Sequence, residues 1–262
     1  MVKIDEKKCI GCGQCAADCL AFNIVMAEKA TIKSECIQCG HCVAICPVDA
    51  VCIPEYDMDD VEEFEKDSFT LKPEQVLHSI KYRRSIRDYT ADTVSKAVLG
   101  QLLQAGRYTA TAKNSQSNGF VFIQKELTTL KTKVWQFIDN MEKDSLKNLD
   151  KALLPYINFN RRRKKNEKDD YLFRNAPVVL FIVSDSPLDA GLAAQNMEMM
   201  AVSMGLGVLY NGYLARIADA NVELKQWLGI EERTIRVCML LGYPAKQYCR
   251  TAPRKEADVI WK

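Results

Sequence analysis

The residues most able to do chemistry are cysteines near the start of the chain. Eight of the eleven cysteines fall into two runs that share the spacing C-x-x-C-x-x-C-x-x-x-C, and Pro47 follows the second run. Thiolates at such short intervals are ligands for metal centres. The runs consist of Cys9, Cys12, Cys15 and Cys19, and of Cys36, Cys39, Cys42 and Cys46.

Zinc sites and disulfides are the alternatives for these cysteines. A structural zinc site takes one C-x-x-C pair from each of two knuckles, which leaves the third and fourth cysteine of each run without a use. Disulfides fit poorly because the sequence carries no secretory signal. Both alternatives are therefore disfavoured, and thiols kept reduced for a metal centre indicate a reducing cytoplasm.

The spacing resembles the ligand pattern of bacterial two-cluster ferredoxins, although Leu20 stands where the first run usually has proline. The resemblance implies two [4Fe–4S] clusters, each of which takes its fourth ligand from the other run. The implied ligand sets are Cys9, Cys12, Cys15 and Cys46 for one cluster, and Cys36, Cys39, Cys42 and Cys19 for the other.

Two short strands are expected to support the cysteine runs, because residues 23–26 and 50–53 occupy equivalent places after them. We take residues 1–56 as a ferredoxin-type domain. A lobe of this size buries little apolar surface, so we expect the clusters to supply its folding energy. The acidic residues 57–70 are predicted to be a solvated linker.

A second chemical site is predicted at Arg83, Arg84, Ser85, Ile86 and Arg87. Three guanidiniums and a hydroxyl within five residues form a concentrated anion site. Arginine forks bind phosphate oxygens in bidentate fashion, and serine adds another donor. A basic helix end that is merely solvated is the alternative.

The RRSIR run resembles the FMN-binding signature of the nitroreductase superfamily, and the resemblance extends over residues 71–262. It implies a three-layer α/β/α FMN-binding domain in which these five residues hold the cofactor. It also implies that Arg254 returns to the FMN phosphate, with Arg250 and Lys255 as alternatives. Chemistry would take place at flavin N5, so no catalytic side chain is predicted.

Two further segments match the superfamily. Asn114, Ser115 and Gln116 match a loop that reaches the flavin from the partner subunit, although a polar turn is an alternative reading. Tyr210, Asn211 and Gly212 match the residues that flank the ring, where backbone N–H groups approach N5 and O4. Glycine suits that position because it lets the backbone come close to the cofactor.

Helices and strands with clear periodicity must position these residues. Pro73 opens the first helix, and Asp92 or Thr93 is predicted to cap the second. The apolar run after Pro177 predicts a strand buried on both faces. The expected helices are 73–80, 94–103, 127–138 and 190–204, and the expected strands are 120–123, 176–183 and 234–241.

Two surfaces allow more than one interpretation. Ala193, Met197, Met200 and Met204 form a stripe that suits a protein core or, as we prefer, the dimer interface that the superfamily builds on a long helix. The basic run 161–165 is usually a solvated face, although a lid or a dock for an acidic partner is an alternative.

Charge and composition exclude several classes of function. Lys and Arg number 36 against 34 Asp and Glu, so the net charge of +2 does not favour nucleic acid. No segment has the apolar length that a membrane span needs. Only two histidines are present, which argues against histidine-based hydrolysis.

We therefore predict an α+β protein with a ferredoxin-like lobe (1–56), an acidic linker (57–70) and a nitroreductase-like domain (71–262). The predicted function is an FMN-dependent oxidoreductase, a cytoplasmic homodimer with FMN at the subunit interface. Electrons would pass from NAD(P)H or a ferredoxin through the clusters and FMN to a nitroaromatic or quinone. The alternatives are an electron-transfer subunit that serves a protein partner and a reductive dehalogenase-type FMN enzyme.

Overall fold

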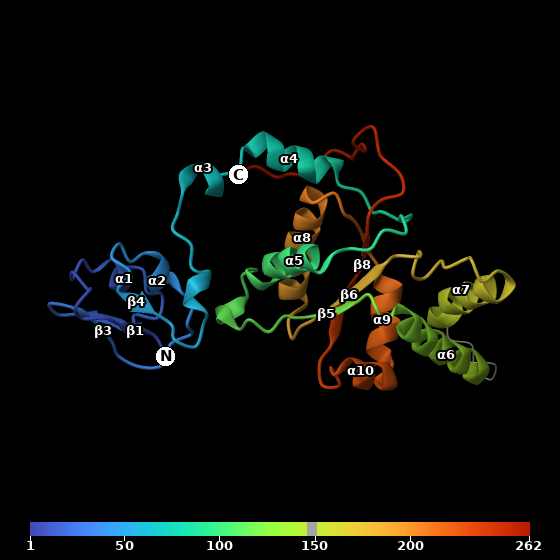
Figure 1. The fold of residues 1–262 in the computed structure, drawn as a ribbon, viewed down its shortest axis with the longest axis horizontal. Helices are drawn as coiled ribbons and strands as arrows, with labels where there is room; N and C mark the ends of the chain where they lie inside the picture. Colours follow the sequence, from blue (N-terminus) through green and yellow to red (C-terminus); the bar gives the residue numbers. More distant parts are fainter. Residues whose placement is uncertain (146–150) are drawn as a thin grey trace. The chain divides into compact units, whose positions relative to one another are not determined.

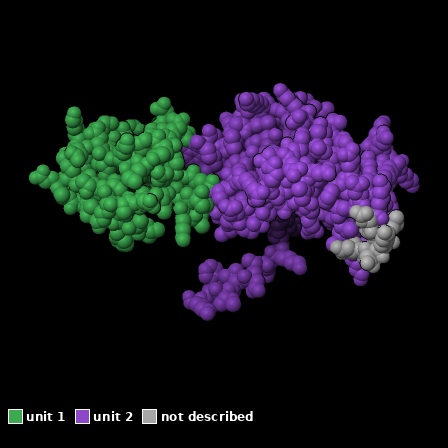
Figure 2. Space-filling model, turned by 90° about the horizontal axis from the view of Figure 1, so that it is seen from below, with its two compact units in different colours: residues 1–71, 111–116 green, residues 72–110, 117–262 purple. Residues whose placement is uncertain are grey.

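The computed structural model describes residues 1–145 and 151–262 (Figure 1). It divides into two compact units, coloured separately in Figure 2. Unit 1 comprises Met1–Leu71 and Thr111–Gln116, and unit 2 comprises Lys72–Ala110 and Ser117–Lys262. None of the described helices is long and apolar enough to cross a membrane.

Unit 1 is a small lobe built from two antiparallel strand pairs and two short helices. The strand pairs join β1 to β4 and β2 to β3, and the predicted strands at 23–26 and 50–53 are confirmed as β2 and β4. The bounds are β1 Lys3–Ile4, α1 Gln14–Ala17, β2 Ile24–Met26, β3 Ala30–Ile32, α2 His41–Ala44 and β4 Val51–Cys52.

The sequence repeat is also a repeat of the backbone. Gly13 begins α1 with φ 76° and Gly40 begins α2 with φ 78°, which is the left-handed region where glycine meets no steric cost. Each short helix then carries the third cysteine of its run, and both of those cysteines, Cys15 and Cys42, are buried. Equivalent glycines therefore present equivalent thiols.

The acidic segment after this lobe contains two short helices, η1 (Met58–Asp60) and α3 (Lys66–Phe69). Asp57 caps η1 by accepting a hydrogen bond from the backbone of Asp59. Every residue from 61 to 70 is exposed, as a solvated segment requires. The remaining element of unit 1 is η2 (Ala112–Asn114), in the segment 111–116.

Unit 2 is organised around one antiparallel sheet with the strand order β5-β6-β8-β7. All six residues of β6 are buried, as the continuous apolar run predicted. The strand bounds are β5 Gly119–Ile123, β6 Val178–Val183, β7 Gly207–Tyr210 and β8 Ile235–Gly242.

One face of the sheet packs against α5 (Lys96–Arg107) and α8 (Pro187–Ser203). Val178, Leu180 and Ile182 of β6 belong to this core, together with side chains of both helices. The period-two alternation of a strand sends every second side chain to this face. Burying each of these side chains contributes about 1.5–3 kcal/mol.

The other face packs against a second set of helices, and Val179, Phe181 and Val183 point into that core. The two cores on opposite faces confirm the predicted three-layer α/β/α arrangement (Figure 1). The helices are α6 Leu127–Ser145, α7 Leu154–Lys165, α9 Gly212–Ala220 and α10 Val222–Leu228, with η3 Lys151–Leu153 before α7.

The first two helices of unit 2 differ in how they follow the sequence. Helix α4 (Pro73–Tyr82) begins with Pro73, as predicted. Helix α5 is capped by Ser95, whose hydroxyl accepts a hydrogen bond from the backbone N–H of Val98. The prediction of Asp92 or Thr93 as the cap is therefore wrong, because the helix begins later than its first apolar residue.

Candidate functional site

Unit 1 contains two cavities that are each lined by four thiols. Each cavity takes three cysteines from one run and the fourth from the other run, which is the grouping that the ferredoxin resemblance implies. The first cavity has Cys9, Cys12, Cys15 and Cys46, and the second has Cys19, Cys36, Cys39 and Cys42.

The arrangement suits a cluster better than a single ion. Within the described residues, no three His, Cys, Asp or Glu side chains converge closely enough to hold one metal ion. A [4Fe–4S] cube takes one thiolate at each of four iron atoms, and four thiols line each cavity. Backbone N–H groups also lie 3.3 Å from three sulfur atoms, those of Cys19, Cys36 and Cys46.

Burial and the backbone shift the acidity of individual thiols. Burial raises the pKa of Cys42 to about 11 and also raises the pKa of Cys15. Hydrogen bonds from the backbone of Ala30 and Gly11 lower the pKa of Cys9. Because a thiol must lose its proton to bind iron, loading of these cavities releases protons.

The segment 111–116 binds the second cysteine run. The side-chain amide of Asn114 donates hydrogen bonds to the carbonyls of Ile37 (3.0 Å) and Gln38 (2.9 Å), which lie between Cys36 and Cys39. The amide of Gln116 donates to the hydroxyl of Tyr56 at 2.8 Å. The structure thus groups these predicted flavin residues with unit 1. The sequence carries no signal for these contacts, because they use backbone carbonyls and one distant hydroxyl.

In unit 2, the RRSIR run is attached to the edge of the sheet. Ser85 forms a parallel bridge with Val208, and the N–H of Ile86 donates to the carbonyl of Val208 at 2.9 Å. A Cβ atom on Gly207 would collide with Ile86, so glycine is needed for this approach. The Tyr89 hydroxyl donates a hydrogen bond of 2.9 Å to the Ile86 carbonyl, which also holds the run in place.

The arginines of this run line a cavity of about 120 Å³ that Arg254 completes. Arg254 comes from the far end of the chain, whereas the two alternatives at 250 and 255 do not line this cavity. Such a set of donors fits a phosphate group, because guanidinium forks match its oxygens. The lining residues are Arg83, Arg84, Ser85, Arg87, Tyr248 and Arg254.

Behind this cavity lies a buried carboxylate that the sequence analysis missed. Glu198 of α8 is 1% exposed and lies 3.3 Å from the guanidinium of Arg83. It also interacts with the hydroxyl of Tyr210. Burial raises the pKa of Glu198, and the charge of Arg83 opposes that shift. The sequence did contain a signal for Glu198, because it is a single acidic residue within an apolar helical stripe. A carboxylate in such a position is expected to be buried and to need a partner.

A larger cavity of about 390 Å³ adjoins the same run, since Arg87 lines both. Tyr210, Asn211 and Gly212 line it as well. The side chain of Asn211 is occupied by the protein, because it caps α9 at Leu214 and donates to the carbonyl of Leu172 at 2.6 Å. Tyr210 and the backbone of Gly212 are therefore the parts of this motif that remain for a ligand.

An aromatic wall of the larger cavity was also missed. Phe159 of α7 stacks on Tyr171 with ring centroids 4.9 Å apart, and it meets Tyr213 edge to face at 5.2 Å. All three rings line the cavity. They come from separate parts of the chain, so no local sequence pattern predicts that these three rings meet.

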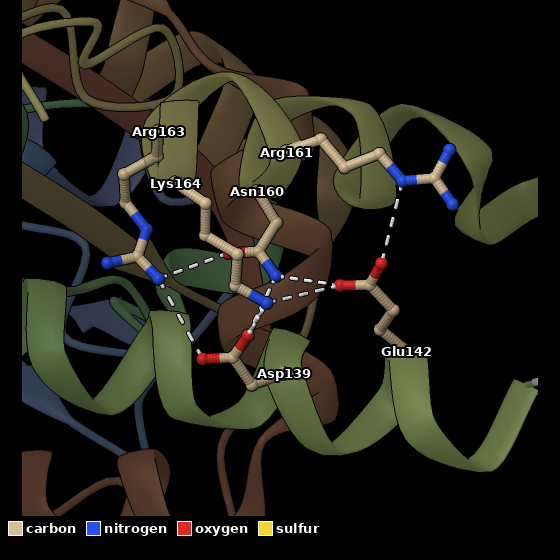
Figure 3. Close-up of polar contacts among 6 residues, drawn as sticks. All are labelled: Asp139, Glu142, Asn160, Arg161, Arg163 and Lys164. Atoms are coloured by element: carbon tan, nitrogen blue, oxygen red, sulfur yellow. Dashed lines mark hydrogen bonds and ion pairs between the residues drawn. The ribbon is translucent and has the colours of Figure 1, made fainter. Parts of the chain in front are cut away.

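Figure 3 shows that the basic run of α7 faces acidic residues of α6. Lys164 lies 2.6 Å from Asp139, and Arg161 lies 3.6 Å from Glu142. The fully buried amide of Asn160 donates to both carboxylates, at 2.8 and 2.9 Å. The run is mostly exposed, as a solvated face requires, and four of its five charges also have acidic partners within unit 2.

The predicted interface stripe on α8 needs correction. Ala193 and Met197 are fully buried in the core that α8 forms with the sheet, and Met200 and Met204 are partly buried against that core. Ala193 and Met197 therefore serve the chain's own packing and cannot meet a partner. The alternative reading as core was correct for them.

Comparison with known proteins places both units. The model of the nitroreductase family matches residues 80–243, and the model of a 4Fe-4S dicluster domain matches residues 1–47. A curated relative from Methanothermobacter thermautotrophicus, described as an inferred NADH dehydrogenase/NAD(P)H nitroreductase, is 25% identical over 181 residues. That match covers 65% of this chain and 78% of the relative.

Solved structures share the fold of unit 2. A nitroreductase with bound FMN from Bacteroides fragilis matches with a TM-score of 0.55 and 23% identity, over 71% of this chain and 97% of that one. An FMN-dependent nitroreductase from Clostridium difficile matches with a TM-score of 0.53 and 21% identity, over 72% and 100% of the two chains.

Proposed function

The chain belongs to the nitroreductase family, and from this premise we propose an FMN-dependent oxidoreductase fed by two [4Fe–4S] clusters. Electrons pass from a donor, NAD(P)H or a reduced ferredoxin, through the clusters and FMN to a small acceptor such as a nitroaromatic or a quinone. The cysteine sets named above hold the clusters. A reducing cytoplasm is the setting that suits a chain with eight thiol ligands.

The observation that carries this proposal is the meeting of Arg254 with the RRSIR run around one small cavity. These residues are far apart in sequence, and their positively charged side chains line the same cavity. Arg83, Arg84, Ser85 and Arg254 hold the FMN phosphate by charge-assisted hydrogen bonds. Lys255 does not take part.

Arg87 and the residues around Gly212 hold the isoalloxazine ring in the larger cavity. Arg87 lines both cavities, so its guanidinium would be placed to offset negative charge on the bound cofactor. The exposed backbone at the start of α9 supplies N–H donors toward the ring, since the first N–H groups of a helix lack partners. Tyr210 flanks the ring, and Glu198 fixes Tyr210 and Arg83 together.

FMN, when bound, accepts single electrons and delivers them in pairs, which joins one-electron clusters to two-electron acceptors. Reduction of a nitro group to nitroso consumes two electrons and two protons and releases one water. The donor supplies the electrons, and solvent supplies the protons. The chain itself binds, orients and encloses the reactants.

We also propose that the protein is a homodimer in which the outward face of α8 meets a second copy. Leu188 and Leu192 are 69% and 44% exposed, and Met199 follows on the same face. Exposed apolar residues at helical spacing are expected at an interface. This face replaces the stripe of Ala193 and Met197. The resemblance assigns Asn114, Ser115 and Gln116 to the partner's FMN, whereas the amides of Asn114 and Gln116 donate within unit 1 in this chain.

Spectroscopy of the purified protein tests the proposal. NADH, NADPH and a reduced ferredoxin are added separately under anaerobic conditions, and absorbance is followed at cluster and flavin wavelengths. Bleaching followed by reoxidation with a nitroaromatic or a quinone is expected. Absence of FMN, or reoxidation only by a protein acceptor, would refute the proposed activity.

A further inference from the structure

The larger cavity of unit 2 carries an excess of positive charge. Arg87, Arg174 and Arg216 line it, and they come from the RRSIR run, the turn before β6 and helix α9. None of its lining residues is acidic. Three guanidiniums around one space of about 390 Å³ create a strong positive potential, because a cavity with low-dielectric walls focuses the field.

These guanidiniums differ from Arg83 and Arg162 in their acidic partners. Across the described residues, no carboxylate forms an ion pair with Arg87, Arg174 or Arg216, whereas Arg83 and Arg162 each have one. Arg216 instead interacts with the hydroxyl of Tyr156. Their positive charges therefore remain available to a ligand.

The position of Arg174 is determined by a strained turn. Its backbone has φ 56°, which is rare for a residue with a side chain. Asp170 holds this turn, because its carboxylate accepts from the backbone N–H groups of Phe173 and Asn175. The carboxylate of Asp170 forms an ion pair with the ammonium of Lys131 at 2.5 Å. It therefore does not neutralise Arg174. The guanidinium of Arg174 lies 3.7 Å from the ring centre of Tyr171.

We propose that this cavity binds a flat, conjugated acceptor that carries a carboxylate or a similar anionic group. The rings of Phe159, Tyr171 and Tyr213 line the cavity, and Arg174 and Arg216 supply the anion contacts. This inference rests on the proposed function, since it names the class of acceptor for the same site.

A count of charges supports an anionic acceptor over a neutral one. FMN brings one phosphate, for which the small cavity already provides Arg83, Arg84 and Arg254. Its reduced ring brings one delocalised negative charge, which Arg87 can stabilise. Arg174 and Arg216 exceed what the cofactor needs. Both guanidiniums therefore remain for a second anion in the same cavity.

A matched pair of ligands tests the proposal. The protein loaded with FMN is titrated with 4-nitrobenzoate and with 4-nitrobenzamide, which have nearly the same outline but differ in charge. Binding is followed by the change in the absorbance of oxidised flavin, so no turnover is needed. We expect 4-nitrobenzoate to bind about tenfold more tightly or better at low salt. Its advantage should shrink as salt is added.

Charge-removing variants locate the effect. Arg174→Gln and Arg216→Gln should each weaken 4-nitrobenzoate binding about tenfold and leave 4-nitrobenzamide binding within about twofold. Lys96→Gln is the control, because this exposed lysine begins α5 on the opposite face of the sheet. Equal affinity of the wild type for both ligands would overturn the proposal, as would variants that keep the preference.

The FMN content of each preparation separates the two proposals. A protein that binds FMN but shows no preference refutes the anionic acceptor alone. A protein without FMN refutes the proposed function, and calorimetry with benzoate on that protein then measures the anion site directly. Benzoate binding lost in Arg174→Gln and Arg216→Gln would still support the anion site.

Discussion

The guanidinium of Arg83 lies 3.3 Å from the carboxylate of Glu198, with 25% of the arginine side chain exposed and only 1% of the glutamate. The pair joins the wall of the small cavity to the core beneath α8. Because one partner is enclosed, removing the other leaves a buried charge without compensation, which is strongly destabilising. Glu198 therefore acts as a positioning residue for Arg83 and Tyr210.

We predict that Glu198→Gln makes unit 2 relatively more stable at high pH. Burial raises the pKa of Glu198 above its ordinary value, so the folded state binds more protons than the unfolded state. Stability then falls as pH rises from the unfolded pKa through the raised folded pKa. Glutamine removes this dependence. The difference in melting temperature, variant minus wild type, should be more positive at pH 8 than at pH 5.

Tryptophan fluorescence of protein without FMN can measure this, because all three tryptophans lie in unit 2. Glu198→Ala is the comparison, since it removes both the charge and the hydrogen-bonding group and should lower the melting temperature at both pH values. A melting-temperature difference that is independent of pH would contradict the assignment.

Arg254→Ala should weaken FMN binding about ten- to a hundredfold. The substitution removes a charge-assisted hydrogen bond to phosphate, which is worth about 1.5–3 kcal/mol. Lys255→Ala is the matched control, because that residue does not line the small cavity. Fluorescence titration of apoprotein with FMN measures both affinities. A larger loss in Lys255→Ala would move the phosphate anchor to that residue.

The crossed grouping of thiols predicts crossed effects of mutation. Cys46→Ala should disturb the cluster of Cys9, Cys12 and Cys15, and Cys19→Ala should disturb the cluster of Cys36, Cys39 and Cys42. Iron analysis and EPR of the reduced variants distinguish the two clusters. The grouping is wrong if each substitution affects only the cluster of its own run.

Leu192→Lys should dissociate the proposed dimer and leave each subunit folded. Leu192 is 44% exposed in one chain, so the ammonium can remain in water once the partner has left. Met197→Lys is the contrasting variant, because that side chain is fully buried and the charge should cost several kcal/mol. Size-exclusion chromatography should give a monomer for the first and aggregates for the second. A stable dimer of Leu192→Lys would exclude this face.

Local patterns predicted much of the fold and the main donor sets. The cysteine runs and the RRSIR run are local sequence motifs, so their chemistry can be predicted without knowledge of the fold. Strand β6 was predicted because both of its faces are buried and all its residues are apolar. The cap at Ser95 was missed because several capping residues precede α5 and only the backbone path selects one.

The missed residues depend on contacts between distant segments. Phe159, Tyr171 and Tyr213 form one wall, yet each is an ordinary aromatic residue in its local sequence. The attachment of Asn114 to the carbonyls of Ile37 and Gln38 uses groups that every residue possesses. Such features follow from the tertiary fold, and periodicity contains no information about them.

The opposed charges of α6 and α7 make one wall of the larger cavity sensitive to ionic strength. Lys164 and Asp139 are partly exposed, so dissolved ions screen their attraction. Phe159 lies on the same helix, little more than one turn from Lys164. Concentrated salt should loosen that helix and widen the entrance for acceptors. Salt would then alter the access of neutral and anionic acceptors alike.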